Sequence, residues 1–377
     1  MDWKVPLAEL DFGPEEEEAV LKVIRSRWLT MGSYTQEFEI KFAELVGVKY
    51  AFAMSNATQA LHLACLALGI GAGDEVIVPS LTFVATSNAV LYTGARVRFA
   101  DILGPHDLTV SPQDIENQIS PQTKAIMVMH YGGYPCQMHR IKEIAAKHGL
   151  LLIEDSAHAP GALLDGIALG AWGDVGCFSF FANKNLAVGE GGMLITNRDD
   201  VAEKVKQLRS HGMTSLTWDR HKGHAYSYDV VELGYNYRID EIRSALGLVQ
   251  LQKLASNNAR RQRITENYRA ALQDTGIDLP FHDVAGRSAY HIFPILLPNS
   301  IDRKKFIDHM RENKIQTSIH YPPIHTFQYY RRHYPDVFLA WTENVASREV
   351  TLPLYPTMSN EDVDAVVSAV RTGLNYQ

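Results

Sequence analysis

From residue 50 onward, short apolar runs alternate with amphipathic segments, and this alternation limits the fold more than any other feature of the chain. The runs have the length of buried strands, and the segments between several of them have helical periodicity. One such segment, Met138–Gly149, closes with the glycine that is typical of a helix end. Strands joined by helices predict a mostly parallel sheet covered on both faces. The expected strands are Tyr50–Met54, Glu75–Pro79, Val97–Asp101, Ala125–Met129, Leu150–Glu154 and Cys177–Phe180.

The pattern changes on either side of this region. Pro14 and the acidic residues after it predict a helix over residues 14–27, and a second helix is expected over Thr35–Leu45. A long helical stretch over Asp240–Leu272 leads to more widely separated strands, and Ser359 can cap a last helix. We expect a large α/β domain over residues 1–250 and a smaller α+β domain over residues 251–377. The strands expected in the second domain are His291–Leu297, Gln316–Tyr321 and Glu349–Leu354.

Composition narrows the function classes. The formal net charge is −7 and Lys/Arg-rich runs are absent, which argues against a nucleic-acid partner, although local donors can still bind a small anion. The three cysteines are widely spaced in apolar segments, which disfavours a disulfide framework or a zinc site, and we expect no metal. The sequence shows neither a signal peptide nor an apolar stretch of about 18 residues, so we expect a cytoplasmic protein without a membrane span.

Polar residues follow two of the expected strands in ways that suggest ligand binding. Ala57 and Thr58 open a helix directly after a strand, where free backbone N–H groups and the Thr58 hydroxyl can bind a phosphate. The alternative is an ordinary helix cap. Asp155 ends the run Leu150–Glu154, and a carboxylate in a buried setting needs a cation or hydrogen-bond donors. A protonated pyridine nitrogen would satisfy it, but so would neighbouring backbone amides.

Two further strand ends carry a lysine and an aromatic ring. Lys184 follows the run Cys177–Phe180 and precedes a glycine-rich segment, so it can lie in a confined pocket where desolvation favours the neutral, nucleophilic amine. Phe83 follows Glu75–Pro79 and could stack on a flat ring. A solvated lysine and a core phenylalanine are the ordinary alternatives. Together the four features supply what pyridoxal 5′-phosphate (PLP) needs: a phosphate site, a stacking ring, a partner for the pyridine nitrogen and an amine that forms a Schiff base.

Motifs along nearly the whole chain resemble the nucleotide-sugar aminotransferases of the DegT/DnrJ/StrS type. The resemblance implies the aspartate-aminotransferase-like PLP-transferase fold, fold type I, with a large domain built on a mostly parallel sheet and a smaller α+β domain. It also implies an enzyme that uses PLP. The segments that carry the resemblance are WLTMG, SNATQALHLA, GDEVIVPSLTFVATSNAV, HYGGYPCQM, IEDSAHAPGA, GCFSFFANKN, GEGGM, LGYNYRIDEIRSALG, YHIFPI and SIHYPPIH.

The resemblance assigns cofactor contacts position by position. Lys184 matches the lysine that binds PLP as a Schiff base, and Asp155 matches the carboxylate that pairs with the pyridine nitrogen. His158 stands where the family has Gln or His near the phenolic oxygen of the cofactor, and Phe83 stands at the stacking position. The phosphate-binding positions are matched by Ala57, Thr58 and Ser179, and by Asn236, which in the family reaches the phosphate of the neighbouring subunit.

The Asn236 match implies a homodimer with shared active sites. On the substrate side, two segments match, one before residue 35 and one around the Pro322-Pro323 pair, which would stiffen its loop. The histidines of the second segment could instead be capping or core residues. The substrate-side matches are Leu29, Thr30, Gly32, His320, Tyr321 and His325.

The implied reaction moves an amino group from an amino acid, by resemblance L-glutamate, to a keto sugar linked to a nucleoside diphosphate. Some relatives carry histidine at the position of Lys184 and dehydrate the sugar, so the lysine favours amino transfer. A keto-cyclitol or other carbocycle as acceptor stays open, as does a PLP-binding regulator without turnover. A nicotinamide-dependent oxidoreductase is disfavoured because the first βα unit lacks G-x-G-x-x-G. The sugar, the nucleotide and the aminated carbon stay open.

Overall fold

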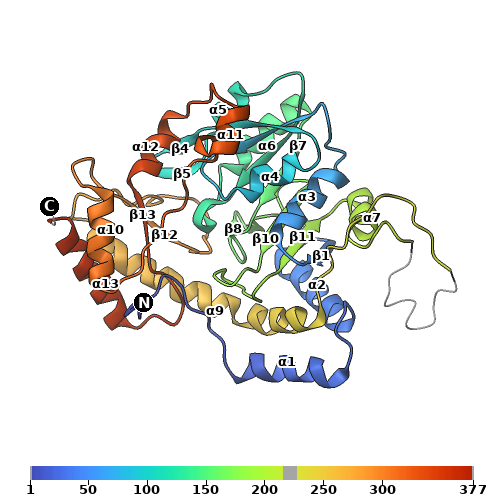
Figure 1. Cartoon of the computed structure of the whole chain (residues 1–377), viewed down its shortest axis with the longest axis horizontal. Coiled ribbons are helices and arrows are strands. Elements are labelled where there is room, and N and C mark those ends of the chain that lie inside the picture. The colour runs from blue at the N-terminus through green and yellow to red at the C-terminus, as the bar shows by residue number, and fades with distance from the viewer. Residues whose placement is uncertain (1, 215–226, 376–377) are drawn as a thin grey trace.

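A seven-stranded sheet forms the centre of the part of the chain that the computed structural model describes, residues 2–214 and 227–375 (Figure 1). β11 is antiparallel to both of its neighbours, and the remaining pairings are parallel, so the sheet is mostly parallel as predicted. The carboxyl ends of the parallel strands therefore meet at one edge. In spatial order the strands are β1 (Tyr50–Met54), β11 (Gly192–Thr196), β10 (Val175–Ser179), β7 (Leu151–Asp155), β6 (Thr123–Met129), β2 (Glu75–Pro79) and β3 (Arg96–Ala100).

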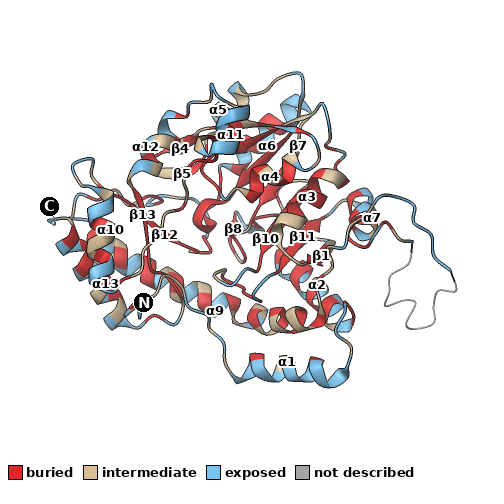
Figure 2. Cartoon of the chain, viewed as in Figure 1, coloured by how far each residue is buried: buried red, intermediate tan, exposed pale blue. Residues whose placement is uncertain are grey.

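Helices cover both faces of this sheet. Alternate residues of β6 belong to different cores: Ala125 and Met127 pack on one side, and Ile126 and Val128 on the other. Because successive side chains of a strand point to opposite faces, a strand buried on both sides is apolar throughout, and Figure 2 shows the sheet as buried. The first core includes α3 (Ala57–Ala67), α4 (Ala85–Leu91) and α7 (Asp199–Leu208); the second includes α5 (Pro112–Asn117) and α6 (Met138–His148).

The long helix α9 (Glu241–Leu272) connects the sheet to the C-terminal elements. Its first residue, Glu241, is buried and accepts the backbone N–H groups of Gly32 and Thr35, which fixes the start of α2 (Ser33–Val46). The helix α1 (Pro14–Ser26) also packs along α9 and has an otherwise largely exposed surface (Figure 2).

A further core, which we call the C-terminal core, surrounds the C-terminal half of α9. Tyr268 of α9 packs with Phe293 and Phe306, away from the large sheet. The domain boundary predicted between residues 250 and 251 falls inside the continuous helix α9, and it stays a prediction. The C-terminal core includes β12 (Phe293–Leu296), β13 (Glu349–Leu352), α10 (Arg303–Glu312) and α13 (Asn360–Gly373). Ser359 caps α13, as expected.

The strand predicted over Gln316–Tyr321 is wrong. Ser318 makes a single bridge to Thr351, and Ile315, just before the segment, makes another to Val5, but the described residues form no continuous ladder there. The Gln316 side chain accepts the backbone N–H of Leu7 instead. The other expected strands are confirmed to within two residues at most ends. Strand β11 was not predicted, because its start is rich in glycine. Four short strands were not predicted either: β4 (Ile102–Gly104), β5 (Asp107–Val110), β8 (Leu163–Leu164) and β9 (Ile167–Ala168).

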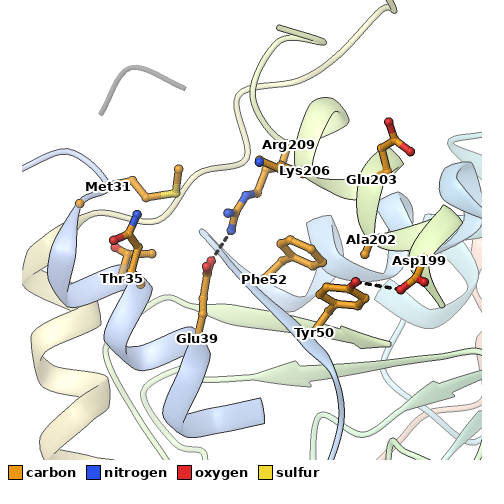
Figure 3. Close-up of a pocket in the computed structure, with 12 residues that line it drawn as sticks. Met31, Thr35, Glu39, Tyr50, Phe52, Asp199, Ala202, Glu203, Lys206 and Arg209 are labelled. Carbon is orange, nitrogen blue, oxygen red and sulfur yellow. Dashed lines mark hydrogen bonds and ion pairs between the residues drawn. The ribbon is translucent and has the colours of Figure 1, made fainter. Parts of the chain in front are cut away.

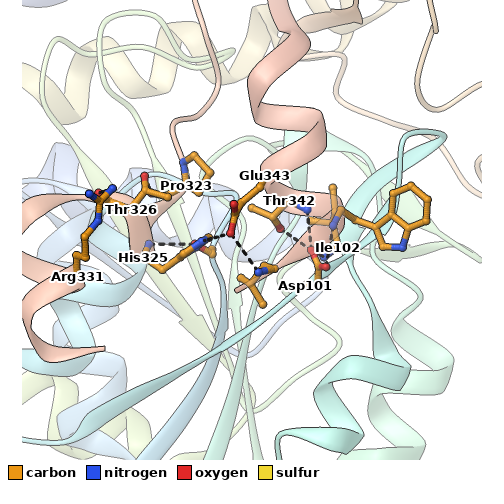
Figure 4. A network of polar contacts seen from close by, with 11 residues as sticks. Asp101, Ile102, Pro323, His325, Thr326, Arg331, Thr342 and Glu343 are labelled. Carbon is orange, nitrogen blue, oxygen red and sulfur yellow. Dashed lines mark hydrogen bonds and ion pairs between the residues drawn. The ribbon is translucent and has the colours of Figure 1, made fainter. Parts of the chain in front are cut away.

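Between α10 and β13, both of which belong to the C-terminal core, the chain returns to the large sheet. Asp101, at the end of β3, accepts the backbone N–H groups of Trp341 and Thr342 and the Thr342 hydroxyl, and so caps the start of α12 (Ala340–Arg348) (Figure 4). Ile324 and Tyr330 join the first core. Ile324 belongs to η2 (Ile324–Thr326) and Tyr330 to α11 (Gln328–His333), and the short helix η1 (Tyr131–Gly133) follows β6.

Among the helices that the structure describes, we find none with the length and apolar character needed to cross a membrane.

Replacing Asp101 should loosen α12. Asp101→Ala removes the acceptor of three hydrogen bonds at a helix start, and we expect the free energy of unfolding to fall by about 2 kcal/mol. Asp101→Asn keeps one acceptor oxygen and should lose less. Asp283→Ala, at a side chain that is 93% exposed, is the matched control and should change little. The measurement is urea unfolding followed by circular dichroism, and equal midpoints for D101A and D283A would contradict the capping role.

Candidate active site

The loops that follow the parallel strands line a cavity of about 640 Å³ at the carboxyl edge of the sheet. Open α/β sheets place their ligand sites at this edge, because the loops after parallel strands converge there. The structure brings nine of the fourteen residues that the sequence singled out to the wall of this cavity. They are Ala57, Thr58, Phe83, Asp155, His158, Ser179, Lys184, His320 and Tyr321.

Lys184 lies in the loop between β10 and β11, partly exposed to the cavity. A turn closed by the hydrogen bond from its N–H to the carbonyl of Phe181 sets its backbone. Burial lowers the pKa of its ammonium group from an ordinary 10.5 to about 8, and the charge of Asp155 opposes that shift. The Nζ atom is 3.4 Å from Nε2 of His291. This lysine is therefore neutral at a much lower pH than a surface lysine and can act as a nucleophile or base.

Asp155 is the last residue of β7 and is buried. Burial raises the pKa of its carboxyl group, while hydrogen bonds from Thr86 and Ala157 and the charge of Lys184 lower it. The Thr86 hydroxyl donates to Oδ2 at 2.7 Å, and the N–H of Ala157 donates to Oδ1 at 3.2 Å. Each carboxylate oxygen can accept more than one hydrogen bond. Asp155 is thus a fixed, desolvated acid with spare acceptor capacity on the cavity wall.

His158 is buried beside the cavity, and burial holds the pKa of its imidazolium well below the ordinary value, so the ring is neutral. Its Nδ1 accepts the N–H of Gly132 at 3.2 Å. A neutral imidazole with Nδ1 as acceptor carries its proton on Nε2. Nε2 lies 2.9 Å from the hydroxyl of Tyr321, so His158 donates to that oxygen and the Tyr321 O–H is left to donate elsewhere.

The start of α3 closes one end of the cavity. Asn56 caps the helix by accepting the N–H of Gln59 at 3.0 Å, and Ala57 and Thr58 form the first turn on the cavity wall. Backbone N–H groups and the helix dipole at such a start favour an anion. Gly192 makes this arrangement possible, because a Cβ there would lie 2.6 Å from the backbone N of Ala57.

Phe83 lies on the cavity wall and is 57% exposed. Its ring centroid is 6.1 Å from that of Tyr321, so the two rings flank the same opening. A half-exposed ring on the wall of a cavity is in a position that suits stacking on a flat group.

Five of the residues that the sequence singled out do not line this cavity in the single chain. Leu29, Thr30 and Asn236 are exposed. Gly32 lines a second cavity, of about 520 Å³, between α2, β1 and α7 (Figure 3). Charged and polar side chains of that cavity already pair with each other, Glu39 with Arg209 and Tyr50 with Asp199.

His325 is the fifth of these residues, and it is buried away from the cavity. Its Nδ1 lies 2.7 Å from the Ser80 hydroxyl and its Nε2 lies 3.1 Å from Glu343 (Figure 4). The ring therefore links η2 and α12 to the end of β2. Its substrate role stays a prediction, as do those of the exposed residues.

Sequence reasoning missed three polar residues at the site. Thr86 supports Asp155 from the first turn of α4, and no local pattern marks it. His291 and Asn185 lie behind Lys184, and Oδ1 of Asn185 accepts from Nδ1 of His291 at 2.9 Å. Both stood in segments that carried the family resemblance, but chain position alone did not show that residues 185 and 291 meet.

A mostly parallel sheet with a desolvated lysine and a buried aspartate at its carboxyl edge is the arrangement of PLP-dependent aminotransferases of fold type I. The chain belongs to the DegT/DnrJ/EryC1/StrS aminotransferase family, whose family model matches residues 11–371. It is therefore a member of a family of sugar aminotransferases, as predicted.

Individual relatives agree with this family. The chain is 39% identical over 367 residues to the spore coat polysaccharide biosynthesis protein SpsC of Bacillus subtilis, covering 95% of this chain and 94% of SpsC. Its structure resembles the aminotransferase TlmJ of Streptoalloteichus hindustanus, with a TM-score of 0.92, 33% identity and coverage of 98% and 99%. It also resembles the PLP form of the putative sugar aminotransferase Spr1654 of Streptococcus pneumoniae, with a TM-score of 0.91, 25% identity and 98% coverage of both chains.

The pKa of Lys184 predicts selective chemical labelling. With a pKa of about 8, most Lys184 side chains are neutral at about pH 9, whereas an ordinary lysine is neutral in only a few per cent of molecules. In the protein without added cofactor, Lys184 should therefore react with an acylating reagent about tenfold or more faster than the exposed Lys22, as followed by peptide mass spectrometry over a pH series. A reaction midpoint shared by the two lysines would contradict the desolvation of Lys184.

Proposed function

We propose that this chain uses PLP, held by Lys184, to transfer an amino group from L-glutamate to a nucleotide-linked keto sugar. The observation that carries the proposal is the meeting of Lys184, Asp155 and the start of α3 on one cavity wall. The name of SpsC connects one relative to polysaccharide synthesis, and the PLP form of Spr1654 connects another to the cofactor. The nucleotide and the glutamate donor come from the family resemblance of the sequence motifs.

The residues at the cavity fit PLP on an independent observation. Three polar atoms, Oε1 of Gln59, Nε2 of His62 and Oδ1 of Asn183, are buried without a hydrogen-bond partner among the described residues, and all three residues line this cavity. Buried polar atoms without partners cost free energy. A polar ligand in the cavity would supply partners, directly or through water, as a phosphorylated cofactor with a polar substrate can.

The proposed roles follow from the state of each group. When bound, PLP supplies an electron-withdrawing ring that stabilises negative charge at the substrate carbon. Asp155 would pair with the pyridine nitrogen, since its desolvated carboxylate is stabilised by a nearby positive charge. Lys184 would anchor the cofactor through Nζ and, when freed, take a proton from the α-carbon of the donor and give it back. A pKa of about 8 suits that exchange near neutral pH.

Other residues would orient the cofactor. His158 would lie near the phenolic oxygen, and because its Nε2–H already donates to the Tyr321 hydroxyl, the Tyr321 O–H would donate to that oxygen. Phe83 would stack on the ring and fix its plane, which limits side reactions. The phosphate would bind at the start of α3 through Ala57 and Thr58, with the Ser179 hydroxyl as a further donor.

The remaining contacts need a second subunit or a substrate. Asn236 is exposed and does not line this chain's cavity, although the next residue, Tyr237, does, which is consistent with a contact to the phosphate in the neighbouring subunit of a homodimer. Such a dimer would share its active sites across the interface. On the substrate side we propose His320 and Tyr321 at the cavity, and Leu29, Thr30, Gly32 and His325 from the predicted segments.

Lys184→Ala should abolish covalent retention of the cofactor. After incubation with PLP and reduction with borohydride, the wild-type peptide that contains Lys184 should gain the mass of the reduced cofactor, and the variant should gain none. Glutamate-dependent formation of pyridoxamine phosphate should fall by about a hundredfold or more, because the variant loses both anchor and proton carrier.

Lys22→Ala, at an exposed lysine of α1, is the matched control and should behave as wild type. Near-normal turnover by K184A, or cofactor mass on another lysine of the wild type, would contradict the assignment. The wild-type protein in its pyridoxamine form can then be offered keto sugars linked to UDP, dTDP or GDP and a keto-cyclitol. Recovery of the PLP absorbance with the cyclitol alone would overturn the proposed sugar acceptor.

Shared active sites predict complementation between two defective variants. Asn236→Ala should weaken the phosphate site of the neighbouring subunit, and K184A inactivates its own site. In a mixed dimer one site carries both defects and the other carries neither. Co-expression in equal amounts should therefore restore up to about a quarter of wild-type activity, since about half the dimers are mixed. Activity no greater than that of the two pure variants would contradict the shared site.

A further inference from the structure

A directed chain of hydrogen bonds runs behind Lys184. Nδ2 of Asn258 donates to the carbonyl of Pro160 at 2.9 Å, and Oδ1 of Asn258 accepts from Nδ2 of Asn185 at 2.8 Å. The same Nδ2 of Asn185 donates to the carbonyl of Ala289 at 2.6 Å. Carbonyl oxygens can only accept, so they fix the orientation of both amide groups.

This orientation decides the proton position on His291. Because Nδ2 of Asn185 is the donor to two oxygens, Oδ1 of Asn185 is left to accept, and it lies 2.9 Å from Nδ1 of His291. Nδ1 must therefore carry the proton. In a neutral ring Nε2 is then unprotonated, and its lone pair faces Nζ of Lys184 at 3.4 Å.

The surroundings keep this ring neutral. His291 is buried, and burial together with the nearby charge of Lys184 holds the pKa of its imidazolium well below the ordinary value. Its ring centroid lies 4.3 Å from that of His158, which is neutral for the same reason. The other titratable groups that face this end of Lys184 are Asp155, His320 and Arg261, of which Arg261 donates to the backbone carbonyl of His291.

We infer that His291 is a positioning residue that holds the free amine of Lys184 through unprotonated Nε2, in a tautomer that Asn185 and Asn258 set. The inference rests on the proposed function only in taking Lys184 as the reactive amine. An acceptor stabilises an ammonium group more than a neutral amine, because the hydrogen bond to the charged form is stronger. His291 therefore offsets part of the desolvation of Lys184. The contact is long, so the lysine can leave it.

Two variants separate the acceptor from the bulk of the ring. In His291→Asn the amide nitrogen stands near the place of Nδ1 and can still donate to Asn185, but nothing accepts from Lys184. In His291→Gln the longer side chain brings an amide oxygen near the place of Nε2. The readout is the pKa of Lys184 in the cofactor-free full-length protein, taken from the pH dependence of its acylation rate by peptide mass spectrometry.

We expect His291→Asn to lower the pKa of Lys184 by about one unit, a tenfold weaker proton affinity, and His291→Gln to restore most of it. His139→Asn, at a histidine whose side chain is 65% exposed, is the matched control and should leave the pKa unchanged. A pKa in His291→Asn that is equal to or above the wild-type value would overturn the inference. Borohydride trapping of PLP tests the proposed function separately, because the pKa comparison uses no cofactor.

If His291→Asn does not fold, the tautomer of His291 in the wild-type protein tests the inference instead. Nitrogen-15 NMR distinguishes protonated from unprotonated imidazole nitrogens, and the signals of His291 are assigned by their loss in His291→Gln. We expect a protonated Nδ1 and an unprotonated Nε2. The opposite tautomer would overturn the inference, because Nε2–H could not accept from Lys184.

Discussion

The structure depends on the cost of burying two ionisable groups at one edge of a parallel sheet. Asp155 ends β7, and Lys184 follows the adjacent β10, whose Cys177 pairs with Asp155 in the ladder. Burial raises the pKa of the carboxyl group and lowers that of the amine, so desolvation pushes each toward its neutral form while their mutual attraction opposes the shift. Other groups must hold such a pair in place, and desolvated ionisable groups of this kind are concentrated at functional sites.

The two adjacent acids at the end of β7, Glu154 and Asp155, are stabilised by different sets of hydrogen bonds. Glu154, next to Asp155, points to the opposite face and accepts backbone N–H groups of Gly170, Trp172 and Gly173, each at 2.7 Å. His130 also lies 2.9 Å from Glu154, so this acid is fully used inside the fold. Within the described part of the chain, the carboxylate of Asp155 accepts only two hydrogen bonds, from the Thr86 hydroxyl and the N–H of Ala157, and keeps acceptor capacity toward the cavity. Adjacent acids on one strand thus have different fates, one structural and one available to a ligand.

Periodicity in the sequence predicted six of the seven strands of the large sheet, because strands buried on both faces are apolar throughout, but it missed β11. It failed for Gln316–Tyr321, where alternating residues use their side chains for contacts other than a ladder. Strand ends also predicted the cavity wall, since parallel strands end at one edge. The contacts of Thr86 and His291 with the site were not predicted, because Thr86 reaches it from a helix and His291 from a distant segment of the chain. Asn236 and Leu29 lie outside the cavity of one chain, and their roles depend on an assembly that the sequence implied only through its family.

A crystal structure of the protein incubated with PLP decides whether Lys184 holds the cofactor at this edge of the sheet. We expect continuous density between Nζ of Lys184 and the cofactor, with Asp155 at the pyridine nitrogen, the phosphate at the start of α3 and Phe83 against the ring. Cofactor bound elsewhere, or bound at this edge with Lys184 turned away and Asp155 without contact to the ring, would contradict it.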